Sequence, residues 1–405
     1  MKYKVLLVSA GQPSLNPRLV KEADTLADNG YDVTVIYAYW NAWGTQLDDD
    51  LIPSKKWTAL RAGGDPIHRP GTYFLSRILF KLANAFTRIT GLMSFAPAAI
   101  SRSSIFLQYE AARHKADIYI GHNLGALPAV VKAAKKYGKP CGFDAEDFHR
   151  NEVTDDSRSL DARMKTAIED KYIPQLNYLS VSSPLIGNVY QQLYPQIKQQ
   201  VLLNAFPKNR FIKADETSTG ILKLFWFSQT VGPNRGIEQI INALQYLKDN
   251  AFELHLLGDA DATIRDAFTS RIHGAKSIVH FYPPIPPDDI FKFASQFDIG
   301  IASENHTPLN RDICLTNKIF TYVQAGLPVL ASNTTAQLHF MQQYAVAGKT
   351  YNSNGIGSIA EALSYYQNNP EALIKDKRHN YVLGQSELNW DTEEQQFLSL
   401  VNQTI

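Results

Sequence analysis

The sequence has little of what disulfide scaffolds, metal centres and membrane spans require. Its two cysteines, Cys141 and Cys314, have no cysteine or histidine close by, which argues against a disulfide framework or a metal site. This cysteine usage is typical of a reducing cytosol. No uninterrupted apolar run reaches the roughly 18 residues of a membrane-spanning helix. The amino terminus, MKYKVLLV, runs directly into a strand pattern without the longer apolar region of a secretory signal. We therefore expect a cytoplasmic protein, either soluble or peripheral on the inner face of the membrane.

An excess of charge of either sign is also missing. Lys and Arg number 40 against 39 Asp and Glu, so the net charge is +1 and nucleic acid is not expected as a partner. The chain is 44% hydrophobic and 20% charged, which is a globular composition. Its 405 residues exceed one comfortable hydrophobic core, so two domains are expected.

Short apolar runs alternate with helical patterns in both halves of the chain. In the first half the patterns predict strands at 5–9, 32–37, 118–121, 140–144, 180–183 and, at the edge, 201–203, with helices at 17–29 and 126–137. In the second half they predict strands at 222–227, 252–257, 278–282, 299–302 and 328–332, with helices at 236–248, 287–295 and 317–325. The polar segment 204–220 is predicted to be a linker. Such alternation indicates two parallel sheets wrapped by helices, which bind ligands at the carboxyl ends of their strands.

The segment 316–332, TNKIFTYVQAGLPVLAS, is the strongest local signal. Thr316 is expected to cap a helix that begins at Asn317, which leaves backbone N–H groups free to bind a diphosphate. Gly326 is expected to end this helix, and Pro328 to open the next strand. Taken alone, the segment also fits an ordinary helix-turn-strand unit.

This segment resembles the PNKIFEYMAAGLPVIAS signature of retaining glycosyltransferases, chiefly glycosyltransferase family 4. Other segments resemble the family's motifs in the same order: 16–36, GHN at 121–123, FDAED at 143–147, 227–238, LLGD at 256–259 and 287–298. The resemblance spans nearly the whole chain. It implies an α/β protein of GT-B architecture, with two doubly wound Rossmann-like domains facing a central cleft. The implied domains are an acceptor-side domain at 1–204, a nucleotide-sugar-binding domain at 205–385, and a C-terminal helix at 386–405 that crosses back to the first domain.

The same resemblance implies an activity. It is hexosyl transfer from a nucleoside-diphosphate sugar to a glycan or lipid-linked glycan, with retention, in cell-surface polysaccharide synthesis. The nucleotide sugar is then a co-substrate, and neither a cofactor nor a metal is expected, because a helix dipole and cations take the metal's place. Two other hypotheses stay open: a degenerate glycosyltransferase that binds without turnover, and a sugar-nucleotide epimerase on the same scaffold.

Two positions of the donor site concern the charge that faces the diphosphate, and one of them departs from the family. Arg235 lies where the family has a lysine that faces the diphosphate, although a solvated loop arginine is the alternative. Gln229 lies where a second basic residue is usual, so a positive charge is missing there. Lys318, in the first turn after Thr316 and Asn317, can replace that charge unless it points to water.

The ribose position departs as well. Thr321 stands where the family has the glutamate that binds the ribose hydroxyls, the second glutamate of a Glu-x7-Glu pattern. The first glutamate of that pattern would fall at Ile313, which is not acidic, although Glu304 and Asp312 are nearby. A threonine can satisfy only one of two vicinal hydroxyls. Three readings follow: a deoxyribose donor such as a dTDP-sugar, a ribose that is held elsewhere, or loss of activity.

Loops after the first-half strands carry the other candidates. Gly11 allows close backbone approach near the reacting sugar. Arg18 is expected either to contact the acceptor or a phosphate, or to be a surface arginine. His122, after the strand at 118–121, either binds the donor sugar or is structural. Asp147, in an acidic group with Asp144 and Glu146, either activates the acceptor hydroxyl or caps a helix.

One stretch, 66–109, contains no Asp or Glu but is rich in basic and apolar residues. On a helix through 74–89, Arg77, Lys81 and Arg88 fall within roughly 40° of one another beside a broad apolar face. This pattern suits an interfacial helix on anionic lipid, or an acceptor site for a lipid diphosphate. The alternative is a helix that packs into the core while its basic side chains extend to water.

Overall fold

The structure is a computed structural model that describes residues 2–208 and 220–405. The described chain forms two compact units, which are treated separately below. Unit 1 runs to Leu203 and also contains Pro308–Asn310 and Glu393–Ile405, whereas unit 2 contains Asn204–Thr307 and Arg311–Thr392. Most of the predicted linker, 204–220, lies outside the described residues.

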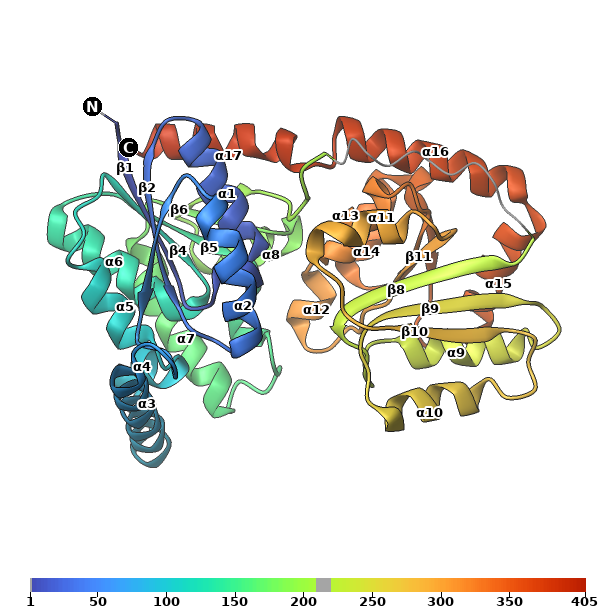
Figure 1. Ribbon diagram of the computed structural model, residues 1–405, viewed down its shortest axis with the longest axis horizontal. Coiled ribbons are helices and arrows are strands. Elements are labelled where there is room, and N and C mark those ends of the chain that lie inside the picture. Colours follow the sequence, from blue (N-terminus) through green and yellow to red (C-terminus); the bar gives the residue numbers. More distant parts are fainter. Residues whose placement is uncertain (1, 209–219) are drawn as a thin grey trace. The chain divides into compact units, whose positions relative to one another are not determined.

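Unit 1 is built on a seven-stranded parallel sheet (Figure 1). Its strand order is β3-β2-β1-β4-β5-β6-β7. The strands are β1 (Lys4–Ser9), β2 (Asp32–Ala38), β3 (Thr58–Ala62), β4 (Ile118–His122), β5 (Cys141–Ala145), β6 (Tyr178–Val181) and β7 (Lys198–Val201). The α-helices are α1 (Pro17–Asp28), α2 (Ala42–Leu51), α3 (Pro70–Thr90), α4 (Ala96–Ile100), α5 (Ser104–Ala111), α6 (Leu127–Tyr137), α7 (Leu160–Tyr172) and α8 (Pro184–Leu193). Short 3-10 turns occur at Pro13–Leu15, Ile52–Ser54, Met93–Phe95, Leu124–Ala126, His149–Asn151 and Ile173–Gln175.

Unit 2 is built on a six-stranded parallel sheet of order β10-β9-β8-β11-β12-β13. The strands are β8 (Leu222–Thr230), β9 (Phe252–Asp259), β10 (Ile278–Tyr282), β11 (Ile299–Ala302), β12 (Val329–Ser332) and β13 (Gly348–Tyr351). The α-helices are α9 (Ile237–Tyr246), α10 (Ala262–Arg271), α11 (Ile290–Ala294), α12 (Leu309–Ile313, which begins in unit 1), α13 (Asn317–Gln324), α14 (Thr335–Gln343), α15 (Ile356–Asn368) and α16 (Pro370–Ser386). The 3-10 turns are Pro287–Asp289 and Ala345–Ala347.

Both sheets are covered on their two faces, which explains their apolar strands. In unit 1, α1 lies on one side of the sheet and α6 on the other, and in unit 2, α9 and α13 lie on opposite sides (Figure 1). The four residues Val5 to Val8 of β1 are each at most 1% exposed. A strand that is buried on both faces has to be apolar at successive positions, which is the pattern that predicted it. The α/β fold class with two Rossmann-like units is therefore confirmed.

The last helix, α17 (Trp390–Thr404), belongs largely to unit 1. Glu393, near its start, accepts a hydrogen bond from the backbone N–H of Leu203 at 2.9 Å, and the hydroxyl of Thr25 donates to Glu394 at 3.2 Å. Trp390 is 4% exposed, as expected of a packing residue. Within the described residues, no helix combines the length and apolarity that crossing a membrane would need.

Candidate functional site

The candidate donor site of unit 2 lies at the carboxyl ends of β8 and β11. The strand order reverses between these two strands, and ligands of doubly wound sheets bind at such a switch point. Gln229 is on the end of β8, Arg235 is in the loop that follows it, and Glu304 follows β11. The start of α13 completes the set, since Tyr322 of α13 packs directly on Gly300 of β11, where a Cβ atom would lie 2.2 Å from the tyrosine ring.

Arg235 is held at this switch point by its backbone. The Ser303 hydroxyl donates to the carbonyl oxygen of Arg235 at 2.7 Å. The next residue, Gly236, has φ +78°, and a Cβ atom there would lie 2.8 Å from the Cβ atom of Ser303, so only glycine fits. The guanidinium of Arg235 is half-buried and has no ion-pair partner among the described residues. A cation without a carboxylate at the carboxyl end of a parallel sheet is available for an anion.

Arg311 is a second cation at this site that the sequence did not single out. Its guanidinium donates to the carbonyl oxygen of Asn234, beside Arg235, at 3.1 Å. Gln229 is exposed and brings no charge. Arg311 rather than Lys318 is thus placed to replace the missing positive charge. The sequence does not reveal that the two arginines are close, because Arg311 lies 76 positions after Arg235 in a one-turn helix.

Lys318 was expected either to replace the missing charge or to point to water, and the structure contradicts both expectations. It neither points to water nor remains free for a phosphate, because its side chain is 10% exposed and its ammonium pairs with Glu304 at 2.8 Å. The ammonium also lies 5.4 Å from the centre of the Trp226 ring. The pair neutralises both charges, so Glu304 is not a free carboxylate either. Asp312, the other nearby acid, pairs with His306 at 2.6 Å and accepts from the backbone N–H of Thr335 at 3.0 Å.

The start of α13 has the backbone geometry expected of an anion site. Thr316 occupies the N-cap position with extended backbone angles, and Asn317 opens the helix. The expected side-chain cap is wrong, however, because the Thr316 hydroxyl makes no capping hydrogen bond. Only its carbonyl oxygen is used, accepting from Ile319 at 3.2 Å. The N–H groups of the first turn remain the feature that suits a diphosphate.

Thr321 is buried rather than open to a ligand. It is 1% exposed, and its hydroxyl has no hydrogen-bond partner among the described residues. The hydroxyl of Thr316 and the indole N–H of Trp226 are likewise buried without a hydrogen-bond partner among the described residues. Leaving a buried polar group unpaired costs about 1–3 kcal/mol, so such groups call for bound water or a ligand. The three lie beside or one turn from Lys318, inside the predicted donor site.

In unit 1, the loop after β1 meets the end of β4. The N–H of Gly11 donates to the Ser9 hydroxyl at 3.1 Å, and that hydroxyl donates to the side-chain oxygen of Asn123 at 3.0 Å. Asn123 has φ +65°, a strained value for a residue other than glycine and one found often at functional sites. A Cβ atom on Gly11 would meet nothing closer than 3.8 Å, so the space beside it is open. Its contact with the donor sugar stays a prediction.

Arg18 is neither a surface arginine nor open to a ligand, which corrects both alternatives. It is fully buried, with its guanidinium 2.6 Å from Asp144 and 3.6 Å from Glu22. It also donates to the carbonyl oxygen of Leu202 at 2.6 Å. Burial opposes the charge of Arg18, but Asp144 and Glu22 outweigh it and raise the pKa of the guanidinium. Arg18 therefore organises a charged cluster inside unit 1.

His122, expected either to bind the donor sugar or to be structural, belongs to the same cluster. The ring is fully buried, with one nitrogen 3.1 Å from Glu22 and the other 3.7 Å from Asp144. Burial lowers the pKa of His122, but the charges of Glu22 and Asp144 more than compensate and raise it. Arg18 and His122 thus share the carboxylates of Glu22 and Asp144. This arrangement favours the structural alternative over direct contact with the donor.

Glu146 and Asp147, just after β5, remain the acid-base candidates of unit 1. Both are half-buried. Burial, followed by repulsion from Asp144, raises the pKa of Glu146 to about 7. Burial and the charge of Glu152 raise the pKa of Asp147. A carboxyl group that titrates near neutral pH suits proton transfer, and this makes Glu146 a candidate beside Asp147. One ligand atom each of His122, Asp144 and Glu146 lie within 4.8 Å of one another, but Arg18 beside Asp144 would repel a metal ion.

Helix α3 exposes the apolar face that a core helix would bury. Its residues with large exposed side chains are Phe74, Leu75, Ile78, Leu82, Phe86 and Ile89, each 44–83% exposed. The fully buried residues of α3 are the small polar pair Ser76 and Thr87. At 100° per residue, the apolar face centres roughly 140° from this pair, so it faces away from unit 1. Arg77, Lys81 and Arg88 are exposed beside it. The alternative of a core-packing helix is therefore wrong.

Comparisons with known proteins find the same fold in solved glycosyltransferase structures. No protein-family model matches the sequence, and no curated protein does. A sucrose-phosphate synthase from Thermosynechococcus elongatus superposes with TM-score 0.71 at 13% identity over 99% of both chains. HepE of Anabaena, solved with UDP and glucose, gives 0.68 at 13% identity over 99% of this chain and all of its own. WaaG, a glycosyltransferase involved in lipopolysaccharide biosynthesis, gives 0.62 at 13% identity over 97% and 98%. The chain thus has the GT-B fold.

Proposed function

We propose that the chain is a glycosyltransferase that moves a hexose from a nucleoside-diphosphate sugar to a glycan or lipid-linked glycan. The acceptor belongs to cell-surface polysaccharide synthesis, and the anomeric configuration is retained. The observation that carries the proposal is the switch point of unit 2, where Arg235, Arg311 and the first turn of α13 lie together. HepE, which shares the fold, has been solved with UDP-glucose, and WaaG is involved in lipopolysaccharide biosynthesis.

In this proposal the diphosphate lies at the start of α13. Arg235 and Arg311 supply two positive charges and the helix supplies N–H donors, with no need for a metal ion. The bond between the anomeric carbon and the phosphate oxygen breaks, and the acceptor hydroxyl forms the new bond on the same face. The two arginines stabilise the charge that grows on the departing nucleoside diphosphate. The acceptor's proton passes to that diphosphate.

A nucleotide panel tests the donor site. We expect one nucleoside diphosphate among UDP, GDP, dTDP and CDP to raise the melting temperature of the full chain. At 100 times Kd, binding adds about 2.7 kcal/mol, which is a rise of about 5–10 °C for a domain of this size. A response to dTDP alone would indicate a deoxyribose donor, as Thr321 allows. The matched control is the corresponding nucleoside, which lacks the anion. If no diphosphate shifts the transition, the donor site does not exist.

A degenerate, binding-only protein is the second candidate, and one observation favours it. Thr321 is buried, and both nearby acids, Glu304 and Asp312, are already paired, so no free carboxylate for the ribose is evident among the described residues. Measuring turnover of a nucleotide sugar distinguishes the two candidates. Hydrolysis or transfer of the sugar from a bound nucleotide sugar indicates the enzyme, and stoichiometric binding without either product indicates the degenerate protein.

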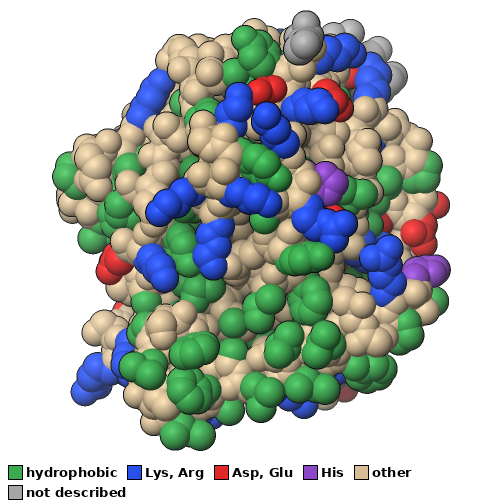
Figure 2. Space-filling view, turned by 90° about the vertical axis from the view of Figure 1, so that its left-hand side faces the viewer, with side chains coloured by type: hydrophobic (Ala, Val, Ile, Leu, Met, Phe, Trp, Pro, Cys, Tyr) green, Lys and Arg blue, Asp and Glu red, His purple; other side chains and the backbone are tan. Residues whose placement is uncertain are grey.

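We further propose that α3 attaches unit 1 to an anionic membrane surface, where a lipid-linked acceptor would be found. Figure 2 looks onto the end of the molecule that carries α3: hydrophobic side chains gather in its lower part, and Lys and Arg side chains lie above them. A helix of this kind lies in the interface with its apolar face among the lipid tails. Its basic residues add attraction of about 1 kcal/mol each to anionic headgroups.

Co-sedimentation with vesicles tests α3. Replacing Arg77, Lys81 and Arg88 together by glutamine should weaken binding to phosphatidylglycerol vesicles about 100-fold, since three such charges contribute about 3 kcal/mol. Replacing Ile78, Leu82 and Ile89 together by serine should weaken it at least as much, at low and high salt alike. The matched control is a triple glutamine variant of the exposed residues Lys135, Arg158 and Lys171. Equal binding by the control and the Arg77 triple variant would contradict the proposal.

A further inference from the structure

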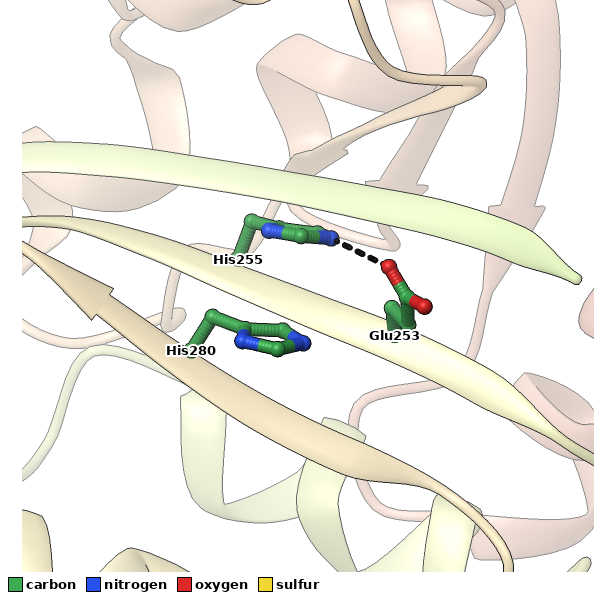
Figure 3. Close-up of side chains that lie close together, drawn as sticks. All are labelled: Glu253, His255 and His280. Atoms are coloured by element: carbon green, nitrogen blue, oxygen red, sulfur yellow. Dashed lines mark hydrogen bonds and ion pairs between the residues drawn. The ribbon is translucent and has the colours of Figure 1, made fainter.

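One edge of the unit 2 sheet carries three side chains of the kinds that bind transition metals. Glu253 and His255 are two positions apart on β9, so their side chains point to the same face. His280, on the edge strand β10, is in register with His255. Figure 3 shows the two imidazole rings stacked and the carboxylate of Glu253 beside the ring of His255.

The distances bring the three groups within reach of one ion. The ring centres of His255 and His280 are 4.6 Å apart, with 13° between the planes. The Glu253 carboxylate lies 3.2 Å from Nε2 of His255. One ligand atom from each residue lies within 4.8 Å of the others. Nε2 of His280 is buried and has no hydrogen-bond partner in the described part of the chain. A buried imidazole nitrogen without a partner is costly unless something binds it.

We propose that Glu253, His255 and His280 form a binding site for a divalent transition metal ion of the zinc type. Two imidazoles and one carboxylate select zinc, cobalt, nickel or copper over magnesium and calcium, which prefer oxygen ligands alone. Such ligands lie about 2.0–2.2 Å from zinc, so small rotations of the side chains would bring them into place. Three protein ligands leave the fourth position to water.

The surroundings hold the His255 ring in the orientation that this site needs. Its Nδ1 atom lies 2.9 Å from the Tyr282 hydroxyl, and its ring packs on Phe297 with the ring centres 4.6 Å apart. A hydrogen bond to one ring nitrogen fixes the tautomer and directs the other nitrogen to the metal.

One charged neighbour opposes the metal. Lys223 of β8 is in register with Glu253, so its side chain lies on the same face of the sheet and its positive charge would repel a bound cation. Lys223 therefore sets the affinity of the site, and removing its charge should strengthen metal binding.

The site is separate from the donor site and has a structural role. His255 lies four residues before Asp259, the end of β9, which is about 13 Å along a strand. β10 is the edge of the sheet and pairs only with β9. A metal ion bound by residues of both strands would fasten this edge, so it should stabilise unit 2 whether or not a nucleotide is bound.

The test uses the full chain, freed of metal with a chelator and titrated with Zn²⁺ and Co²⁺ separately. We expect one equivalent of Co²⁺ to bind with the visible absorption bands of nitrogen- and oxygen-bound cobalt. His280→Ala should weaken binding about 100-fold or more, because even loss of a supporting group costs about 10–100-fold. The matched control is His339→Ala, an exposed histidine of the same unit, which should bind as the parent does.

Lys223→Met is the second variant of the test, and its result does not depend on a destabilised protein. It should strengthen Zn²⁺ binding several-fold, since it removes a competing positive charge and leaves all three ligands in place. Absence of cobalt bands, or equal affinity in the parent, His280→Ala and His339→Ala proteins, would overturn the proposal. A nucleotide-induced thermal shift that persists in His280→Ala shows that the protein is folded, and keeps this test apart from the donor site.

Discussion

Replacing Arg18 by alanine is expected to lower the free energy of unfolding of unit 1 by about 3–5 kcal/mol. The guanidinium is fully buried between Asp144 and Glu22, and it also binds the carbonyl oxygen of Leu202. Alanine would leave the buried carboxylates of Asp144 and Glu22 without their guanidinium partner. A buried charge that loses its partner costs more than the pair contributed, because it keeps the cost of leaving water.

Urea unfolding followed by circular dichroism measures this loss. The matched control is Arg158→Ala, whose side chain is 90% exposed and pairs with Asp156 at 3.1 Å. That exposed pair should be worth less than about 1 kcal/mol. Arg18→Lys should fall between the two, since it keeps the charge but not the planar set of donors that also reaches Leu202. A loss of less than 1 kcal/mol for Arg18→Ala would mean that the cluster does not hold unit 1 together.

The strands were the most predictable part of the fold, and the exceptions have a physical cause. Predictions at 278–282 and 299–302 coincide with β10 and β11, and most others differ by a few residues at the ends. β3 and β13 were not predicted. Their sequences, TALRA and GKTY, lack an apolar run because edge strands are covered less completely than central ones. A pattern of apolar residues reports burial, so it finds the centre of a sheet better than its edges.

The positions of the donor-site residues were predictable, but their partners were not. Parallel strands bring their carboxyl ends together, so the resemblance placed Arg235 and the start of α13 at one edge of the sheet. The sequence could not show that Lys318 pairs with Glu304, 14 residues earlier, or that Arg311 reaches the loop of Arg235. Arg18 was misjudged for the same reason, because a charged residue on a helix is normally exposed. Side-chain pairing depends on tertiary packing, which periodicity does not encode.

For helix α3, the sequence could not predict the orientation of the helix on unit 1. The sequence identified a helix with an apolar face and a basic stripe but left open which face meets the protein. Ser76 and Thr87 made the difference: Ser76 bonds to the carbonyl oxygen of Tyr73 and receives a bond from Arg102. A small polar residue with hydrogen bonds, such as Ser76, can be buried at low cost. The hydroxyl of Thr87 is buried without a partner among the described residues, and the large apolar side chains lie outside.

Replacing Arg235 by alanine is expected to reduce kcat/KM for the nucleotide-sugar donor by about 100–1000-fold, which corresponds to about 2.7–4 kcal/mol of transition-state stabilisation. Its guanidinium lacks an ion-pair partner in the described chain and sits where the diphosphate is proposed to bind. Because charge grows on the diphosphate as the glycosidic bond breaks, kcat should fall more than KM rises.

Steady-state transfer assays with the nucleotide sugar selected by the thermal panel measure the effect. Arg311→Ala should lower kcat/KM by a smaller factor, since this residue is half-buried on a one-turn helix and one of its nitrogens already binds the Asn234 carbonyl oxygen. The matched control is Arg271→Ala, an exposed arginine at the end of α10, which should leave both constants unchanged. If the Arg235 and Arg271 variants transfer sugar equally well, the diphosphate is bound elsewhere. If Arg235→Ala raises KM and leaves kcat intact, Arg235 binds donor and transition state equally and does not stabilise the leaving group.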